Sequence, residues 1–374
     1  MAESSTSRLI DLYEKYGQSP WLDNLRRSYI TTGQLERYLE MGVRGLTSNP
    51  TIFQKAIQDS SDYDEQLSEL AHQDLSVTDT YWALVLKDIA DAADIFAHLF
   101  QKSNGQDGQV SVEVDPHLSY DEHATIQAAI ELRERLTAPN VLIKIPATKN
   151  GLIAIEDLVS QGFSINVTLI FSLERYIEVL EAYVSGLETL ATRLPEKVKD
   201  VVGVASFFIS RVDAVVDLEL SALDTDISRK YAGRAAILQA QMAYLHFLSV
   251  QQSQRWKKLE QIGAHLQRPL WASTSTKNPL YRDTLYVDEL IGRNTVNTIP
   301  EETMLAFYDH GVASQSLDEM SINTPGLWKE FLSTGIDLQS ISHKLEADGV
   351  RSFEHSFDVL LEALQVKIEN IHAR

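Results

Sequence analysis

Cysteine is absent from the 374 residues of this chain. Its absence excludes disulfides, thiolate zinc sites, iron–sulfur clusters and cysteine nucleophiles. Long hydrophobic runs are also missing, because no apolar stretch approaches the ~20 residues that a membrane-spanning helix needs. The first ten residues lack the basic stretch and apolar block of a secretion signal. We therefore expect a protein of the cytoplasm that does not bind a membrane.

Basic residues are scarce. The chain has 33 Lys and Arg against 53 Asp and Glu, a formal net charge of −20. This charge repels nucleic acid and anionic membranes at long range, so we expect neither as a partner. A small anionic substrate is compatible with this negative net charge only if a few basic residues gather in one pocket. A homo-oligomer is compatible with the composition as well.

Several motifs of common active sites are missing. The ten histidines show no H-E-x-x-H and no paired metal spacing, and no G-x-S-x-G occurs. Neither G-x-G-x-x-G nor G-x-x-x-x-G-K-[ST] follows an apolar run. We expect no metal, no cofactor and no nucleotide site of these types.

Short β-branched, apolar runs alternate with longer segments of helical periodicity, which predicts parallel strands joined by crossover helices. Expected strands are 21–23, 44–48, 110–114, 141–145, 165–170, 201–208, 270–272 and 295–298, and expected helices include 79–100, 122–136, 173–190 and 229–250. Eight strands favour an α/β fold of the closed (β/α)₈ TIM-barrel type. The alternative, an open doubly wound sheet, lacks its usual phosphate-binding turns.

A typical barrel uses ~250 residues, which leaves more than a hundred for additional helices. No linker rich in proline, glycine or serine and no internal repeat separates a second domain. We expect one barrel domain over 1–374, in which 312–374 is a C-terminal helical segment packed on the barrel.

Polar residues inside the expected strands are informative, because barrel strands are covered on both faces except near their carboxyl ends. Lys144 lies within the apolar run VLIKIPA. A lysine is usually a solvated surface residue, but burial here would favour the neutral amine that attacks carbonyl groups. The alternative is a lysine at the barrel rim that pairs with Glu113.

The alternation of side chains places further polar groups on the inner face. Glu113 would carry protons for the lysine or form a barrel salt bridge. Asn49 and Asn166 suit hydroxyl recognition, although asparagine also caps turns. Thr168 shares the face of Asn166 and could equally be an ordinary strand residue.

Two cations follow late strands, where barrels often bind phosphate. Arg211 lies in SFFISRVD and Lys277 in ASTSTKNP, and both have hydroxyl-bearing neighbours. Each would supply positive charge to a phosphate. The alternative is that both are solvated loop residues.

The segments GLTSNPTIF, VSVEVDP, LIKIPAT, INVTLIFS, SFFISRVD and LWASTSTKNP, in this order, resemble those of the transaldolase family, in particular its long bacterial type. The resemblance runs from about Trp21 to the C-terminus. It implies a (β/α)₈ barrel in which Lys144 is the Schiff-base lysine on the fourth strand. Glu113 and Thr168 would position a proton-relaying water, and Asp23 in PWLDNL would be the general acid/base.

The resemblance also implies a binding pocket. Asn49 and Asn166 would hold hydroxyls of a dihydroxyacetone unit. Ser206 and Phe208 would line the pocket, and Arg211 would bind phosphate.

Two segments depart from the shorter transaldolases. These carry serine and arginine in a compact S-F-R turn, which Ser273 or Ser275 and Lys277 would replace here. Asp23 is set in PWLDNLRR, without the glycine-containing turn of the shorter forms.

The implied reaction belongs to the non-oxidative pentose phosphate pathway. It transfers dihydroxyacetone from sedoheptulose 7-phosphate to glyceraldehyde 3-phosphate, giving erythrose 4-phosphate and fructose 6-phosphate without a cofactor. One alternative is a fructose 6-phosphate aldolase that uses the same lysine. Another is a non-catalytic barrel that binds sugar phosphates. The segment after Gly311 would cover the site, a hypothesis that rests on its length and position.

Overall fold

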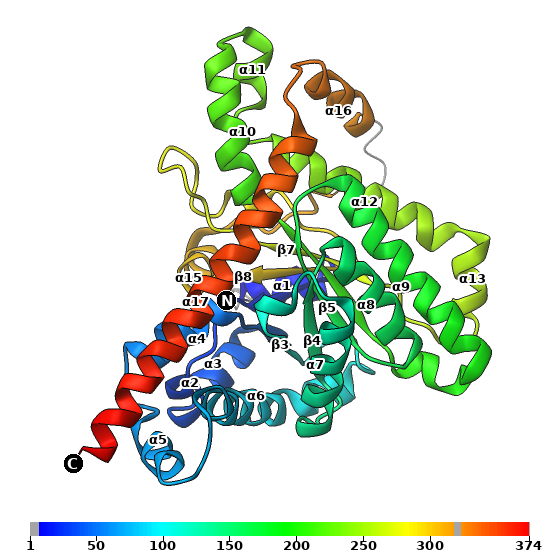
Figure 1. The fold of residues 1–374 in the computed structure, drawn as a ribbon. Coiled ribbons are helices and arrows are strands. Elements are labelled where there is room, and N and C mark those ends of the chain that lie inside the picture. The colour runs from blue at the N-terminus through cyan, green and yellow to red at the C-terminus, as the bar shows by residue number, and fades with distance from the viewer. Residues whose placement is uncertain (1–6, 318–322, 374) are drawn as a thin grey trace, which may run out of the picture.

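The protein forms a closed barrel of parallel strands surrounded by helices (Figure 1), as seen in a computed structural model that describes residues 7–317 and 323–373. The strands follow one another in sequence order, and β8 pairs with β1 to close the barrel. The predicted TIM barrel is therefore confirmed. The strands are β1 Gln18–Leu22, β2 Gly45–Thr47, β3 Gln109–Glu113, β4 Val141–Pro146, β5 Ile165–Ile170, β6 Gly203–Phe208, β7 Arg268–Ala272 and β8 Thr295–Ile299.

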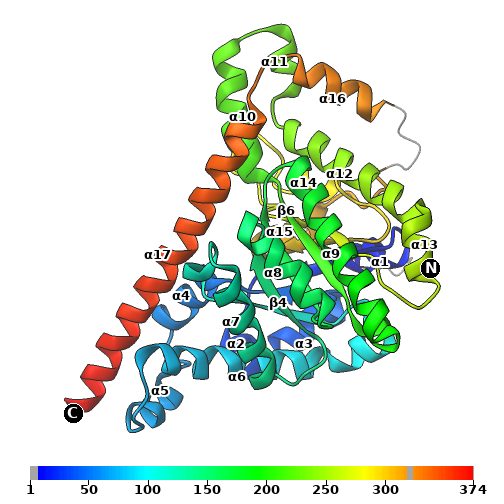
Figure 2. The same ribbon diagram turned by 45° about the vertical axis from the view of Figure 1, so that its right-hand side comes forward.

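The helices form the outer layer (Figures 1 and 2). In the first half of the chain they are α1 Arg8–Glu14, α2 Arg27–Thr31, α3 Gln34–Met41, α4 Pro50–Gln58, α5 Asp64–Ala71, α6 Val77–Lys102, the 3₁₀ turn η1 Pro116–Leu118, α7 Glu122–Arg135, α8 Lys149–Ser160 and α9 Leu173–Arg193. In the second half they are η2 Pro195–Asp200, α10 Ser210–Leu223, α11 Asp226–Tyr231, α12 Ala235–Gln252, α13 Gln254–Glu260, α14 Leu285–Asp288, α15 Glu301–His310, α16 Thr324–Leu332 and α17 Leu338–His372.

The strand register places the polar residues of β3, β4 and β5 at one height in the barrel. Glu113 pairs with Lys144 in the β3–β4 register, and Lys144 pairs with Asn166 in the β4–β5 register. Val110 and Val112 alternate with the inward residues of β3 and are buried. The alternation read from the sequence thus brings three functional groups from neighbouring strands side by side.

A β-bulge interrupts β5. The register with β6 shifts between Val167 and Ile170, and Leu169 has a φ of 59°, the left-handed region that a leucine rarely adopts. A Cβ added to Gly349 of α17 would lie only 3.0 Å from Leu169 Cδ2. The bulge and this glycine therefore allow α17 to approach β5 closely.

Helix α17 is the long C-terminal helix, and it crosses the barrel before running past α4 and α5 (Figures 1 and 2). Ser356 of α17 shares a 2.8 Å hydrogen bond with Thr51 of α4. Arg175 of α9 forms a 3.3 Å ion pair with Glu346. These contacts attach α17 to helices on both sides of the barrel. Residues 318–322 and 374 of the expected helical segment lie outside the described residues.

One expected helix is wrong. The range 229–250 covers the end of α11 and most of α12, and the two helices are separated by a turn at Gly233 with a φ of +67°. The Gly233 N–H donates to Asp217 at 2.8 Å, and a Cβ at this position would come within 2.7 Å of the Tyr281 ring. The turn needs a glycine in the left-handed region. The apolar periodicity of the surrounding residues did not reveal this turn.

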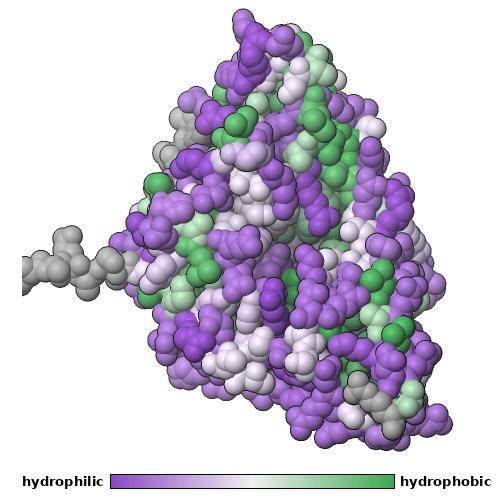
Figure 3. Space-filling model, turned by 90° about the vertical axis from the view of Figure 1, so that its left-hand side faces the viewer, coloured by the Kyte–Doolittle hydropathy of each residue, from purple (hydrophilic) through white to green (hydrophobic). Residues whose placement is uncertain are grey.

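The face of the molecule in Figure 3 is largely hydrophilic, with hydrophobic residues in small separate patches. Throughout residues 7–317 and 323–373, no helix has the length and apolar character to cross a membrane. The hydrophobic side chains instead fill the space between the barrel and its helices.

Candidate functional site

A cavity of about 350 Å³ opens at the carboxyl end of the barrel strands. Its lining residues lie at strand ends, in the segments just after them, and on three helices, α4, α10 and α17. The carboxyl end of the strands is the usual place of a site in this fold. Most of the site residues predicted from the sequence line it: Asp23, Asn49, Lys144, Thr168, Ser206, Phe208, Arg211, Ser273, Ser275 and Lys277. Glu113 and Asn166 lie behind this lining.

Lys144 is buried at the inner end of the cavity, with 4% of the residue exposed. Its Nζ donates to Glu113 Oε2 at 3.0 Å and to the Ser48 carbonyl at 3.1 Å. The pairing with Glu113 considered from the sequence is therefore present, but inside the barrel rather than at a solvated rim. Both partners hold the amine in one place.

Glu113 and Thr168 each keep an unused polar atom near the lysine. Neither Glu113 Oε1 nor Thr168 Oγ1 has a hydrogen-bond partner among the side chains and backbone groups that the structure describes. Burial raises the pKa of the Glu113 carboxyl, and the positive charge of Lys144 opposes that rise. Such buried, unsatisfied oxygens suit a bound water that carries protons.

Asp23 directly follows β1 and is held by a chain of hydroxyls. Thr47 Oγ1 donates to Asp23 Oδ1 at 2.8 Å, and Thr298 Oγ1 lies 2.6 Å from the same threonine oxygen. Because the Thr47 hydroxyl has one proton and gives it to Asp23, Thr298 is the donor to Thr47. The carboxylate is thus oriented by β2 and β8.

The charge of Asp23 is balanced by its surroundings. Burial raises the pKa of its carboxyl. The positive charge of Lys144 and the hydrogen bond from Thr47 oppose that rise most strongly, and Arg211 and Lys277 add to them. Burial and partial compensation by cations are the conditions in which a carboxyl exchanges protons with a substrate.

The two predicted asparagines are used differently. Asn49 caps α4, since its Oδ1 accepts from Ile52 N–H at 3.0 Å, and it also lines the cavity. Asn166 donates to Ser111 Oγ at 3.0 Å and accepts from Ser206 Oγ at 2.7 Å. Asn166 is thus fully buried and supports Ser206, which lines the cavity in its place.

An aromatic wall formed by Phe171, Phe208 and Phe353 borders the cavity. The rings of Phe208 and Phe171 pack with their centroids 5.1 Å apart. Phe353 of α17 lines the cavity, and Lys144 Nζ lies 5.5 Å from its ring centroid. The hypothesis that the C-terminal segment covers the site therefore has a structural basis in this residue.

The other end of the cavity is cationic. Arg211, in the first turn of α10, lies over the Phe208 ring at 5.2 Å, and Lys277 Nζ donates to Ser275 Oγ at 2.9 Å. Ser273 has a φ of 56° and shares a 2.9 Å hydrogen bond with Ser210, the first residue of α10. Burial lowers the pKa of both Arg211 and Lys277. This arrangement suits an anionic group, and a phosphate above all.

Sequence reasoning missed part of the lining: Thr47, Lys55, Ala272, Thr298, Pro300 and Phe353. Thr47 shares a strand face with Asn49, which was a usable signal. Lys55 lies in the segment TSNPTIFQK, six residues beyond the predicted Asn49, and could have been found there. Phe353 gave no signal, because its helix has an ordinary apolar stripe.

The arrangement as a whole supports covalent chemistry on a carbonyl compound. It combines a buried amine, two carboxyls with raised pKa values and an anion-binding end. No group of three or more His, Asp or Glu suited to a metal ion occurs in the described ranges.

The chain is similar to known proteins over almost its whole length. The sequence pattern of the family Transaldolase/Fructose-6-phosphate aldolase matches residues 20–364. A transaldolase of Saccharopolyspora erythraea is 41% identical over 98% of this chain and 99% of its own. A transaldolase of Parafrankia sp. is 44% identical, with 94% and 96% covered, and one of Mycolicibacterium smegmatis is 42% identical, with 94% and 95% covered.

Proposed function

Because this chain belongs to the transaldolase/fructose-6-phosphate aldolase family, we propose that it acts as a transaldolase, as its relatives of that name do, with Lys144 as its Schiff-base lysine. The reaction moves a dihydroxyacetone unit from sedoheptulose 7-phosphate to glyceraldehyde 3-phosphate. The observation that carries the assignment is the place of Lys144: a buried amine that ends in the cavity, beside Glu113 and within the aromatic wall.

The first stage joins donor and enzyme. Lys144 passes a proton to Glu113, to which its Nζ is hydrogen-bonded at 3.0 Å, and the amine then adds to the ketose carbonyl and gives a carbinolamine. Loss of the hydroxyl as water then needs a proton. Glu113 Oε1 and Thr168 Oγ1 support this step, since both are free to bind the water that delivers it. The product is a positively charged iminium.

The second stage breaks the bond between C3 and C4 of the ketose. Asp23 accepts the proton of the C4 hydroxyl, the C3–C4 electrons move into the iminium to form an enamine, and erythrose 4-phosphate leaves. Asp23 must be ionised before it can accept a proton. The nearby cations and the hydrogen bond from Thr47 support this role, because they stabilise the ionised carboxylate against the effect of burial. Addition of glyceraldehyde 3-phosphate reverses these steps and returns the proton.

Substrate groups away from the reacting carbons are bound along the cavity. Asn49 and Ser206 are placed to contact hydroxyls of the dihydroxyacetone unit, and Asn166 orients Ser206 from behind. Arg211, Lys277, Ser273 and Ser275 form the phosphate end.

Borohydride trapping tests the proposal. Incubation with fructose 6-phosphate and borohydride should add the mass of a reduced dihydroxyacetone unit to the peptide that holds Lys144. Lys144→Met, which keeps an unbranched side chain and removes the amine, should give no adduct. An adduct on another lysine, or none on the folded wild-type enzyme, would overturn the assignment.

The family also includes aldolases, so the acceptor must be varied. A transaldolase forms sedoheptulose 7-phosphate from fructose 6-phosphate only when erythrose 4-phosphate is added. Rapid release of free dihydroxyacetone without an acceptor would instead identify a fructose 6-phosphate aldolase that uses the same lysine.

We also propose the cytoplasm as the place of this reaction. The support is chemical: the substrates are phosphorylated sugars, and the chain has no cysteine that an oxidising compartment would pair.

A further inference from the structure

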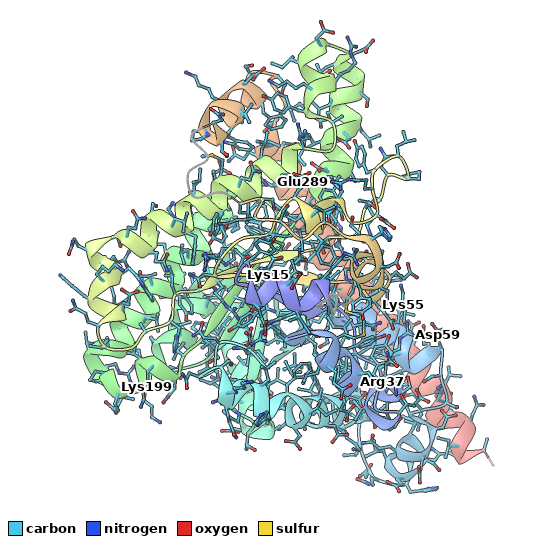
Figure 4. The ribbon with its side chains drawn as sticks, turned by 180° about the vertical axis from the view of Figure 1, so that it is seen from behind. Lys15, Arg37, Lys55, Asp59, Lys199 and Glu289 are labelled. Atoms are coloured by element: carbon cyan, nitrogen blue, oxygen red, sulfur yellow. The ribbon has the colours of Figure 1, made fainter. Side chains whose placement is uncertain are left out.

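Lys55 is the charged residue of the cavity lining that has no role in the proposed mechanism. It lies on α4, the helix that follows β2 (Figure 4), whereas Arg211 follows β6 and Lys277 follows β7. The cavity thus receives positive charge from two separate parts of the barrel rim.

The fold fixes the direction of Lys55. Asn49 caps the start of α4, and Phe53, Ala56 and Ile57 are buried against the core. Thr51, one turn before Lys55 on the same helix stripe, is hydrogen-bonded to Ser356 of α17. The helix is therefore held on two sides, and Lys55 extends from its remaining face into the cavity mouth.

Lys55 carries positive charge that the protein leaves unneutralised. Asp59, the residue that follows α4, lies at the usual spacing of a helical ion pair from Lys55, yet no ion pair joins the two side chains among the described residues. In the described parts of the chain, Arg211 and Lys277 likewise form no ion pair with a carboxylate.

The three cations are close enough to influence one another. Burial lowers the pKa of Lys277, and the charges of Arg211 and Lys55 lower it further, while Asp23 opposes them. Gathering like charges costs free energy that a bound dianion would recover. A bound phosphate would therefore account for the placement of three cations around one cavity.

We propose that Lys55 is a phosphate ligand of donor and acceptor substrates and forms, with Arg211 and Lys277, a three-cation site. This inference rests on the proposed transaldolase function. Lys55 approaches the phosphate from the side of α4 and supplies a mobile point charge at the exposed edge of the site. Lys55 is not one of the residues at the reacting carbons, so it contributes to substrate binding and not to the chemical steps.

Acceptor kinetics test the proposal. With sedoheptulose 7-phosphate as donor held saturating, Lys55→Met should lower kcat/KM for glyceraldehyde 3-phosphate about tenfold, the size of one charge-assisted hydrogen bond. The value for unphosphorylated glyceraldehyde should stay within about twofold. Inorganic phosphate should inhibit the variant about tenfold more weakly, and Lys55→Arg should restore both properties. Lys102→Met, a change of an exposed lysine at the end of α6, is the matched control and should change neither.

The outcomes separate this inference from the proposed function. If trapping on Lys144 fails, the function is wrong whatever Lys55 does. If trapping succeeds and Lys55→Met treats both acceptors alike, whether by leaving both unchanged or by impairing both, the assignment of Lys55 to phosphate is overturned. Circular dichroism and trapping on the variant show that α4 and the reaction centre are intact.

Discussion

Phe353 of the C-terminal helix lies with its ring centroid 5.5 Å from Nζ of Lys144 on β4. The phenylalanine is almost fully buried, and it is placed by the contact of Gly349 with Leu169 one turn earlier and by the bond of Ser356 to Thr51 one turn later. An apolar ring next to the amine would exclude water from the covalent intermediates that we propose for this lysine.

The first prediction concerns this exclusion of water. Phe353→Ala should raise the release of free dihydroxyacetone from fructose 6-phosphate, relative to transfer, about tenfold, because water can then reach the enamine and the iminium. Both rates are measured on one preparation, with and without erythrose 4-phosphate. Phe353→Leu keeps most of the apolar volume and should resemble the wild type. An equal loss of both rates in the alanine variant would show that Phe353 contributes only to binding.

The second prediction concerns the ionisation of Asp23. The hydrogen bond from Thr47 lowers the pKa of this carboxyl, so Thr47→Val should raise it. Because Asp23 must be ionised to accept a proton, the acid limb of the kcat–pH profile should move to higher pH, with kcat about tenfold lower near neutral pH. Thr47→Ser keeps the hydroxyl and should keep the limb in place. An unmoved limb in the valine variant would contradict the assignment of Asp23 as the base.

The third prediction concerns a buried ion pair at the junction of α2 and α6. Asp88, which is fully buried, accepts from Arg27 Nε and from the Tyr63 hydroxyl, both at 2.8 Å. Asp88→Ala leaves the guanidinium buried without its partner and should cost about 3–5 kcal/mol of stability. The urea midpoint should fall markedly. Asp91→Ala removes an exposed carboxylate from the same helix and should shift the midpoint little. Equal shifts would mean that the pair contributes no more than a surface contact.

The fourth prediction concerns Asp213 of α10. Burial raises the pKa of its carboxyl to about 7 from an ordinary value of 3.8, although it accepts the Ala236 N–H. The stability that this group contributes is therefore complete below about pH 3.8 and is lost as the pH rises through about 7.

Asp213→Asn keeps the acceptor oxygen and cannot ionise. The unfolding free energy of the variant minus that of the wild type should rise between pH 4 and pH 7 by on the order of 4 kcal/mol. Above that range the difference should be constant. Asp226→Asn, at an exposed helix start, should show no such change. A difference for Asp213→Asn that does not vary with pH would refute the raised pKa.

The sequence predicted the barrel because its signals are local. The β-branched runs VSVEV and INVTLI alternate with amphipathic helices, and the parity of Glu113, Lys144 and Thr168 within their strands placed all three on the inner face. The structure keeps that parity.

The same reasoning could not find residues whose role depends on distant contacts. Phe353 belongs to the apolar stripe of its helix, and only the docking of α17 over β5 brings it to Lys144. For Asn166 the sequence correctly predicted the inner face of the barrel but not the depth. Its hydrogen bonds to Ser111 and Ser206 hold it behind the cavity lining. The depth of a residue in a barrel follows from strand shear and bulges, which periodicity does not encode.

Helix α17 also has a consequence for biosynthesis. All eight strands are complete at Ile299, whereas the cavity wall needs Phe353. A ribosome therefore delivers every strand, with Asp23 and Lys144 in place, before it delivers the residue that shields the lysine. A nascent or prematurely terminated chain that ends before Phe353 holds every strand of the barrel but lacks the ring next to the amine, so that shielding of this group is the last property that translation gives the protein.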